Sequence, residues 1–174
     1  RHISIPGVEV CDYPGKKKNK AYNIVFAIDT SASVSSYEIQ EIFSELKAIM
    51  DMSTETHITV VECDTQIHKV YELGKTLDVR VSGRGGTDFN PVFKWVCGKA
   101  DFEGTKCDKV PDLLIYATDG ECSLPQQEVR IPANKVLWLL SSRGSLPCEG
   151  TYWGKSTTEV SGYGDYGRFV KIVR

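Results

Sequence analysis

The order of apolar and polar positions divides the chain into strand-like and helix-like segments. Near-continuous apolar runs occur at residues 22–29, 57–63, 111–121 and 135–140, and such runs are typical of strands buried on both faces of a sheet. Residues 35–51 have another period, with apolar side chains three or four positions apart, which predicts an amphipathic helix. Strands therefore alternate with helical segments along the chain.

The remaining patterns are weaker. Residues 66–73 alternate loosely and follow the 57–63 run through a short turn, so we expect a hairpin and an antiparallel edge strand. A further short strand is predicted to begin within 77–81, and residues 82–93 form a glycine-rich loop that runs into a helix. Residues 167–173 predict the last strand, whereas 141–166, rich in Gly, Ser and Tyr, predict no clear element.

This alternation predicts an α/β fold: a doubly wound, mostly parallel sheet with helices on both faces and an antiparallel edge. We expect residues 1–20 to be an N-terminal linker or extension and 21–174 to form one domain. In such sheets, ligands bind outside the carboxyl ends of the strands. Asp29 and Asp119 each lie at such an end, so we expect the two carboxylates to share one edge of the sheet.

Charge and composition narrow the class of protein. The net charge is −2, which gives no general attraction to nucleic acid or to an anionic membrane. The chain has no apolar run of the ~20 residues that a membrane-spanning helix needs. Its six cysteines form no CxxC pair, which argues against structural zinc. We therefore expect a cytoplasmic protein with reduced thiols, although the spacing of Cys97 and Cys107 leaves a disulfide between them open.

Three segments rich in oxygen ligands stand at strand ends or in the glycine-rich loop: residues 29–33, 85–88 and 118–120. Hydroxyls and carboxylates without His or Cys suit a hard cation, with Mg²⁺ as the first choice and Mn²⁺ as the second. A simpler interpretation of Ser31 and Ser33 is that they cap the helix that follows. Asp88 is open to both interpretations, as a ligand or as the cap of the next helix.

The order of these segments resembles the metal-ion-dependent adhesion site (MIDAS) of von Willebrand factor A (VWA) domains. The family's DxSxS motif matches the 29–33 segment, its threonine matches the glycine-rich loop, and its aspartate follows a central strand. The resemblance implies a binding module rather than an enzyme, in which hydroxyls contact the metal, two aspartates act mainly through water, and a partner's carboxylate takes the open position. The implied metal-site residues are Asp29, Ser31, Ser33, Thr87 and Asp119.

Within this family, the sequence is most similar to one bacterial and phage branch, the VWA-like domain that follows a metallopeptidase-like region. The sequence motifs that carry this resemblance are GRGGTDF at 83–89, PVF at 91–93, TDG at 118–120 and the Leu137-Trp138 pair. Ala32 stands where that branch commonly has Gly, and the sequence contains no HExxH segment. The likeness implies a MoxR-type AAA+ ATPase as the partner.

Other functions fit the residues less well. A metal-dependent phosphatase or hydrolase would use Asp29 as its nucleophile, but Ser31 stands where the haloacid dehalogenase type needs a second aspartate as proton donor. A serine hydrolase is disfavoured because no GxSxG occurs. The acidic balance argues against a nucleic-acid-associated VWA module. The prediction is therefore an Mg²⁺-dependent protein-binding module with no catalytic residues.

Overall fold

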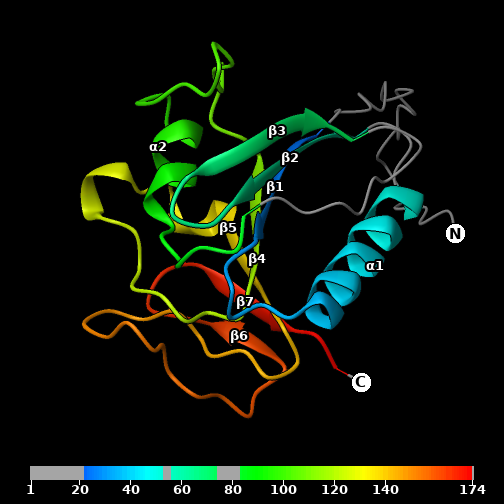
Figure 1. Cartoon of the computed structure of the whole chain (residues 1–174), viewed down its shortest axis with the longest axis vertical. Helices are drawn as coiled ribbons and strands as arrows, with labels where there is room; N and C mark the ends of the chain where they lie inside the picture. The colour runs from blue at the N-terminus through cyan, green and yellow to red at the C-terminus, as the bar shows by residue number, and fades with distance from the viewer. Residues whose placement is uncertain (1–21, 53–55, 74–82, 174) are drawn as a thin grey trace, which may run out of the picture.

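A mixed β-sheet forms the centre of the domain, as the computed structural model shows for residues 22–52, 56–73 and 83–173 (Figure 1). The predictions for residues 1–20 and 77–81 lie outside these described residues. The strands are β1 (Asn23–Asp29), β2 (His57–Cys63), β3 (Ile67–Glu72), β4 (Leu113–Thr118), β5 (Val136–Leu140), β6 (Ser161–Tyr163) and β7 (Arg168–Lys171). The α-helices are α1 (Ser36–Met52) and α2 (Asn90–Val96), and two short 3₁₀ turns cover Gln127–Val129 and Ala133–Lys135.

The sheet is parallel in its centre and antiparallel at both edges. Its strand order is β3-β2-β1-β4-β5-β7-β6. Strands β2, β1, β4, β5 and β7 run parallel, whereas β3 and β6 pair antiparallel with β2 and β7. The chain winds outward in both directions from the β1–β4 pair, which is therefore the switch point where ligands bind in sheets of this kind. The predicted fold class and the antiparallel edge are confirmed.

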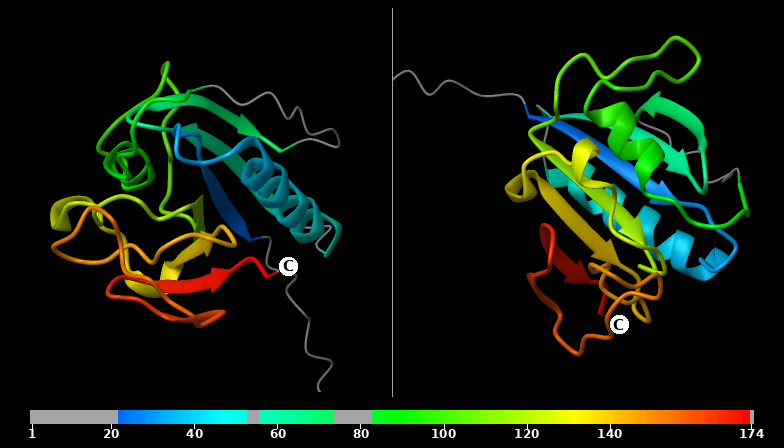
Figure 2. Two further views of the ribbon diagram at one scale, coloured as in Figure 1. Left: turned by 60° about the horizontal axis from the view of Figure 1, so that its bottom comes forward. Right: turned by 90° about the vertical axis from the view of Figure 1, so that its left-hand side faces the viewer.

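Within the described residues, one α-helix covers each face of the sheet. Figure 2 (right) shows α2 in front of the strands and α1 behind them. Successive β1 residues alternate between the two cores: Val25 and Ala27 pack with the α2 side, and Phe26 and Ile28 with the α1 side. The α2 core is rich in aromatic rings, which include the fully buried Trp138. Burial on both faces explains why these strands appear in the sequence as continuous apolar runs.

The C-terminal half departs from a regular doubly wound fold. In the described residues, β4 and β5 are joined by 3₁₀ turns rather than an α-helix, and β5 and β7 by a long loop that contains β6. Pro125 and Pro132 flank the first of these turns, and proline removes the backbone donor that a longer helix requires. The 141–166 segment, for which the sequence predicts no element, contains β6, the strand at the second edge of the sheet.

Two further expectations concern residues spread over the fold. No helix of the described chain combines the length and apolarity needed to cross a membrane. The five described cysteines are free thiols, including Cys97 and Cys107. Burial raises the pKa of the Cys63 thiol far above its usual range, so this side chain acts as a small buried apolar group.

Candidate functional site

The two aspartates of the predicted site lie at the carboxyl edge of the sheet. Asp29 is the last residue of β1, and Asp119 directly follows β4. The two strands are neighbours in parallel register, with Ile28 opposite Ala117. Both aspartates are buried. The structure thus places these carboxylates at one edge of the sheet, as the strand pattern predicts.

Asp29 is a fully buried carboxylate held by two hydrogen bonds. Its Oδ1 accepts from the backbone N–H of Ser31 at 3.0 Å, and its Oδ2 accepts from the Thr118 hydroxyl at 2.6 Å. Burial raises the pKa of Asp29 to about 6 despite these bonds, and the negative charge of Asp119 adds to the rise. No Lys, Arg or His of the described residues forms an ion pair with either aspartate. Buried carboxylates without a countercharge fit a site that takes up a cation.

Ser31 and Ser33 lead from this buried carboxylate to the surface. Their hydroxyl oxygens are 3.0 Å apart; Ser31 is buried and Ser33 is exposed. Neither hydroxyl caps α1. That role belongs to Ser35, whose hydroxyl accepts from the Glu38 N–H while the Glu38 carboxylate accepts from the Ser35 N–H, a capping box. The helix therefore uses neither serine hydroxyl; the two interact within the site, with each other and, through Ser31, with Asp29.

The glycine-rich loop lies directly against the DxSxS segment. The Gly85 carbonyl accepts from the Ala32 N–H at 2.9 Å, and the Thr30 carbonyl accepts from the Arg84 N–H at 3.0 Å. A Cβ atom on Gly83 would lie 2.4 Å from the Thr30 hydroxyl oxygen, so this approach needs glycine. These contacts bring the loop that carries Thr87 to the same edge as the serines.

The Thr87 side chain sits at the border of the buried region, with 9% of its surface exposed. Its carbonyl accepts from the Cys122 thiol at 3.3 Å, which ties the loop to the segment after Asp119. The hydroxyl of Thr87 forms no hydrogen bond within the described part of the chain. Unlike the two serine hydroxyls, which bond to each other, it is thus without a partner among the described residues.

Asp64 organises this loop, and the sequence prediction does not include it. It follows β2 with 4% of its surface exposed. Its Oδ2 accepts from the Gly85 N–H at 2.9 Å, its carbonyl accepts from the Asp88 N–H at 3.0 Å, and His68 Nε2 lies 2.8 Å from its Oδ1. The pKa of Asp64 lies below its usual value because these hydrogen bonds outweigh burial, which acts in the opposite direction. A lone aspartate at a strand end was the signal available in the sequence.

Thr118 is the last residue of β4, and its role in positioning Asp29 is absent from the sequence prediction. Its hydroxyl donates to Asp29 and accepts from the Gly120 N–H at 2.9 Å. It therefore joins the end of β1 to the turn that carries Asp119. In that turn, Asp119 Oδ1 accepts from the Glu121 N–H at 3.1 Å.

Asp88 serves the following helix. Its Oδ1 accepts from the backbone N–H of Asn90, the first residue of α2, at 2.9 Å. This contact is the one expected of a residue at a helix start, and it uses one carboxylate oxygen of Asp88. The N-cap position itself is taken by Phe89, which has no side-chain cap hydrogen bond, so Asp88 contacts the helix start from the residue before it.

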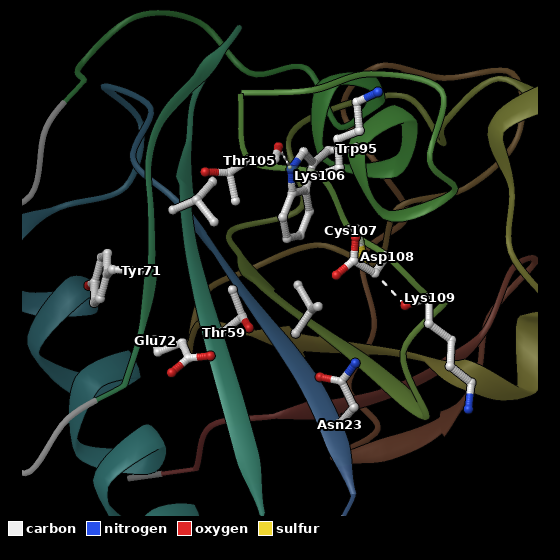
Figure 3. A pocket seen from close by; sticks show the side chains of 12 residues that line it. Asn23, Thr59, Tyr71, Glu72, Trp95, Thr105, Lys106, Cys107, Asp108 and Lys109 are labelled. Atoms are coloured by element: carbon white, nitrogen blue, oxygen red, sulfur yellow. Dashed lines mark hydrogen bonds between the residues drawn. The ribbon is translucent and has the colours of Figure 1, made fainter. Parts of the chain in front are cut away.

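A separate pocket of about 430 Å³ lies away from these residues (Figure 3). It is lined by the first residues of β1 and β2, among them Asn23 and Thr59, together with Trp95 and the 105–109 loop. In a parallel sheet these strand starts lie at the edge opposite Asp29. None of the candidate metal-site residues lines this pocket.

The donor set at the carboxyl edge fits a hard cation better than a soft one. Within the described ranges, no group of three His, Cys, Asp or Glu side chains could hold a metal ion. A metal at this edge would therefore depend on hydroxyl oxygens as well as on the two carboxylates, and such oxygen-rich sets suit Mg²⁺.

Comparison with known proteins identifies a family to which the chain is similar. The family model described as "VWA-like domain (DUF2201)" matches residues 24–158. This range includes every candidate metal-site residue and ends within the connection between β5 and β7.

Individual proteins are also similar to the chain. An uncharacterized protein of Thermotoga maritima is 27% identical over 130 residues, which make up 74% of this chain and 29% of that protein. The chain thus spans less than a third of the relative's length. Among solved structures, an aerotolerance-related membrane protein of Bacteroides fragilis with multiple mutations to serine aligns at 11% identity and a TM-score of 0.48, over 79% of this chain and 78% of that one.

Proposed function

The chain belongs to the VWA-like domain family DUF2201, and from this premise we propose that it is an Mg²⁺-dependent protein-binding module. VWA-like domains are generally non-catalytic interaction modules. In the proposed site, the hydroxyls of Ser31, Ser33 and Thr87 would hold the metal, and Asp29 and Asp119 would act through water. When bound, the metal would supply a positive centre that attracts a carboxylate of a partner protein.

One observation carries this proposal: three segments distant in sequence converge on one edge, where serine and threonine hydroxyls accompany buried carboxylates. The Ser31 and Ser33 hydroxyls contact each other, and the loop of Thr87 is hydrogen-bonded to the same segment. Asp29 has no cationic partner among the described residues. Without a nearby positive charge, burial makes the ionised form of Asp29 unfavourable. A dication would supply that charge.

The same geometry disfavours Asp29 as the nucleophile of a phosphatase. Its exposed fraction is 0%, and each of its oxygens accepts a hydrogen bond from the chain. A nucleophile needs an approach path for its substrate. We therefore propose that the chain is not an enzyme.

The partner is proposed from the resemblance alone. The sequence phrases shared with the metallopeptidase-associated bacterial and phage branch make a MoxR-type AAA+ ATPase the first candidate to test. The chain spans 29% of the Thermotoga relative. A partner that also contacts the remainder of such a protein would therefore make only some of its contacts with this chain.

The direct test uses a labelled nine-residue peptide of Gly and Ser with a central Glu, and a matched peptide with Gln in its place. We expect fluorescence anisotropy to show binding of the Glu peptide in Mg²⁺, and its loss in EDTA, with the Gln peptide, and in the Thr87→Ala variant. Thr87→Ser keeps the hydroxyl and should retain binding. Equal binding of the Glu and Gln peptides, or binding that survives EDTA, would contradict the proposal.

A further inference from the structure

An exposed aromatic pair stands on the long connection between β5 and β7. Tyr152 is 45% exposed and Trp153 is 69% exposed, and their rings meet edge to face with centroids 5.4 Å apart. The other two tryptophans, Trp95 and Trp138, are 3% and 0% exposed. Two adjoining aromatic side chains in solvent are unusual for a surface and are the residue types that dominate binding interfaces.

The segment that carries this pair is fastened to the turn of Asp119. The Asp119 carbonyl accepts from the Ser145 N–H at 2.7 Å. Gly154 packs so closely that a Cβ atom there would lie 2.9 Å from the Gly120 carbonyl oxygen. Trp153 precedes Gly154, and Asp119 precedes Gly120, so the aromatic pair lies on the order of 10 Å from Asp119. In Figure 1 this orange segment lies at the end of the molecule where β1 leads into α1.

Two arginines lie near the start of α1. The Arg84 guanidinium donates to the Val34 carbonyl at 3.2 Å and to the Ser36 hydroxyl at 3.1 Å, so it is fixed beside the start of α1. Arg143, on the loop after β5, is exposed and lies near Glu38, whose negative charge offsets part of it. A fixed arginine beside hydroxyl-lined carboxylates favours a negatively charged partner segment.

We infer that Tyr152 and Trp153 form a second contact point for the partner segment whose carboxylate binds at the candidate metal site. The segment would carry an aromatic or large aliphatic side chain a few residues from its Asp or Glu, since an extended chain spans about 3.3 Å per residue. This inference rests on the proposed function and adds a sequence requirement to it. The backbone that carries the pair is fastened by the contacts of Ser145 and Gly154, so binding would order little additional backbone.

The test extends the peptide set of the previous section. Phe replaces one Gly or Ser at each position from four before to four after the central Glu, and each peptide is titrated in Mg²⁺. We expect Phe at one or two positions to tighten binding about fivefold, the size of an aromatic pair contact. The Trp153→Ala variant should lose this gain and bind the Phe-free peptide as the unchanged protein does.

Tyr163→Ala is the matched control. Tyr163 is 79% exposed and stands opposite Arg168, the first residue of β7, so it presents an aromatic ring at the amino end of that strand. This variant should keep the full gain from Phe.

Three results would overturn the inference: no position at which Phe tightens binding, a gain that survives Trp153→Ala, or self-association of the protein that Trp153→Ala abolishes, which would assign the pair to a second copy of the chain. The proposed function is judged separately, from the binding of the Phe-free Glu and Gln peptides with Mg²⁺ and with EDTA.

Discussion

At the scale of single residues, the candidate site depends on side chains that hold Asp29 in place. The Thr118 hydroxyl donates the shorter of the two hydrogen bonds to that carboxylate, at 2.6 Å. Replacing it with a methyl group leaves a buried oxygen without its donor, which costs about 1–3 kcal/mol. We therefore expect Thr118→Val to lower the free energy of unfolding by about 2 kcal/mol and to weaken Mg²⁺ binding.

Calorimetry and urea unfolding would measure both effects of Thr118→Val. Thr118→Ser is the matched control, because it keeps the hydroxyl and should bind Mg²⁺ as the unchanged protein does. Unaltered Mg²⁺ binding by Thr118→Val would show that the orientation of Asp29 does not matter to the site.

Asp64 gives a prediction on pH. Its folded-state pKa lies below the ordinary value of 3.8, and the unfolded chain therefore binds the proton more tightly. The stabilisation from Asp64 is fully present above that ordinary value and is lost as the pH falls through the folded-state pKa. Urea unfolding should show Asp64→Asn to be less stable than the unchanged protein at pH 7, by about 2 kcal/mol, with the difference shrinking below about pH 4. A difference that stays constant from pH 7 to pH 3 would contradict this role.

The sequence predicts the candidate ligands better than it predicts the residues that position them. Asp29, Ser31 and Ser33 stand together in one short motif, so their neighbourhood can be seen directly. Asp64 and Thr118 act on loops far away in sequence: Asp64 bonds to Gly85, and Thr118 to Asp29. Such partners depend on which strands lie side by side, and that order is not written in any local pattern.

At the scale of elements, the glycine-rich loop offers a matched pair of substitutions. A Cβ atom on Gly85 would lie 2.8 Å from Asp64 Oδ2, whereas on Gly86 its nearest contact would be Thr65 Cγ2 at 3.5 Å, an ordinary van der Waals distance. We expect Gly85→Ala to push the loop away from Asp64 and to weaken Mg²⁺ binding about tenfold, the effect of about 1.4 kcal/mol. Gly86→Ala should bind Mg²⁺ normally, and similar losses in both variants would refute a specific role for the Gly85 contact.

The elements themselves follow from the sequence wherever the apolar pattern is long. The runs that become β1, β2, β4 and β5 are continuous because both faces of these strands are covered, and α1 keeps its helical period because one face packs on the sheet. The β5–β7 connection escaped prediction for a physical reason. Its order comes from backbone contacts, such as Ser145 to Asp119 and Gly154 against Gly120, which leave no periodic pattern of side chains.

At the scale of the whole molecule, one edge of the sheet gathers the candidate metal site, the arginine beside α1 and the exposed aromatic pair. A ligand that binds only the folded state stabilises it, by about 1.4 kcal/mol for each tenfold rise in concentration above the dissociation constant. We expect Mg²⁺ at constant ionic strength to raise the free energy of unfolding in this way. Asp119→Asn should remove most of the effect, and equal stabilisation of this variant would indicate binding elsewhere.

The central claim is that hydroxyls of the 29–33 segment hold a metal ion, and calorimetric titration with Mg²⁺ tests it most directly. Ser33 and Ser35 make an informative pair, because both are exposed and they lie two positions apart. Ser35 caps α1, whereas the Ser33 hydroxyl forms a hydrogen bond only with Ser31 among the described residues. We predict saturable binding by the unchanged protein, its loss in Ser33→Ala, and normal binding by Ser35→Ala with a stability about 1 kcal/mol lower. Equal Mg²⁺ binding by the unchanged protein and Ser33→Ala would contradict the account.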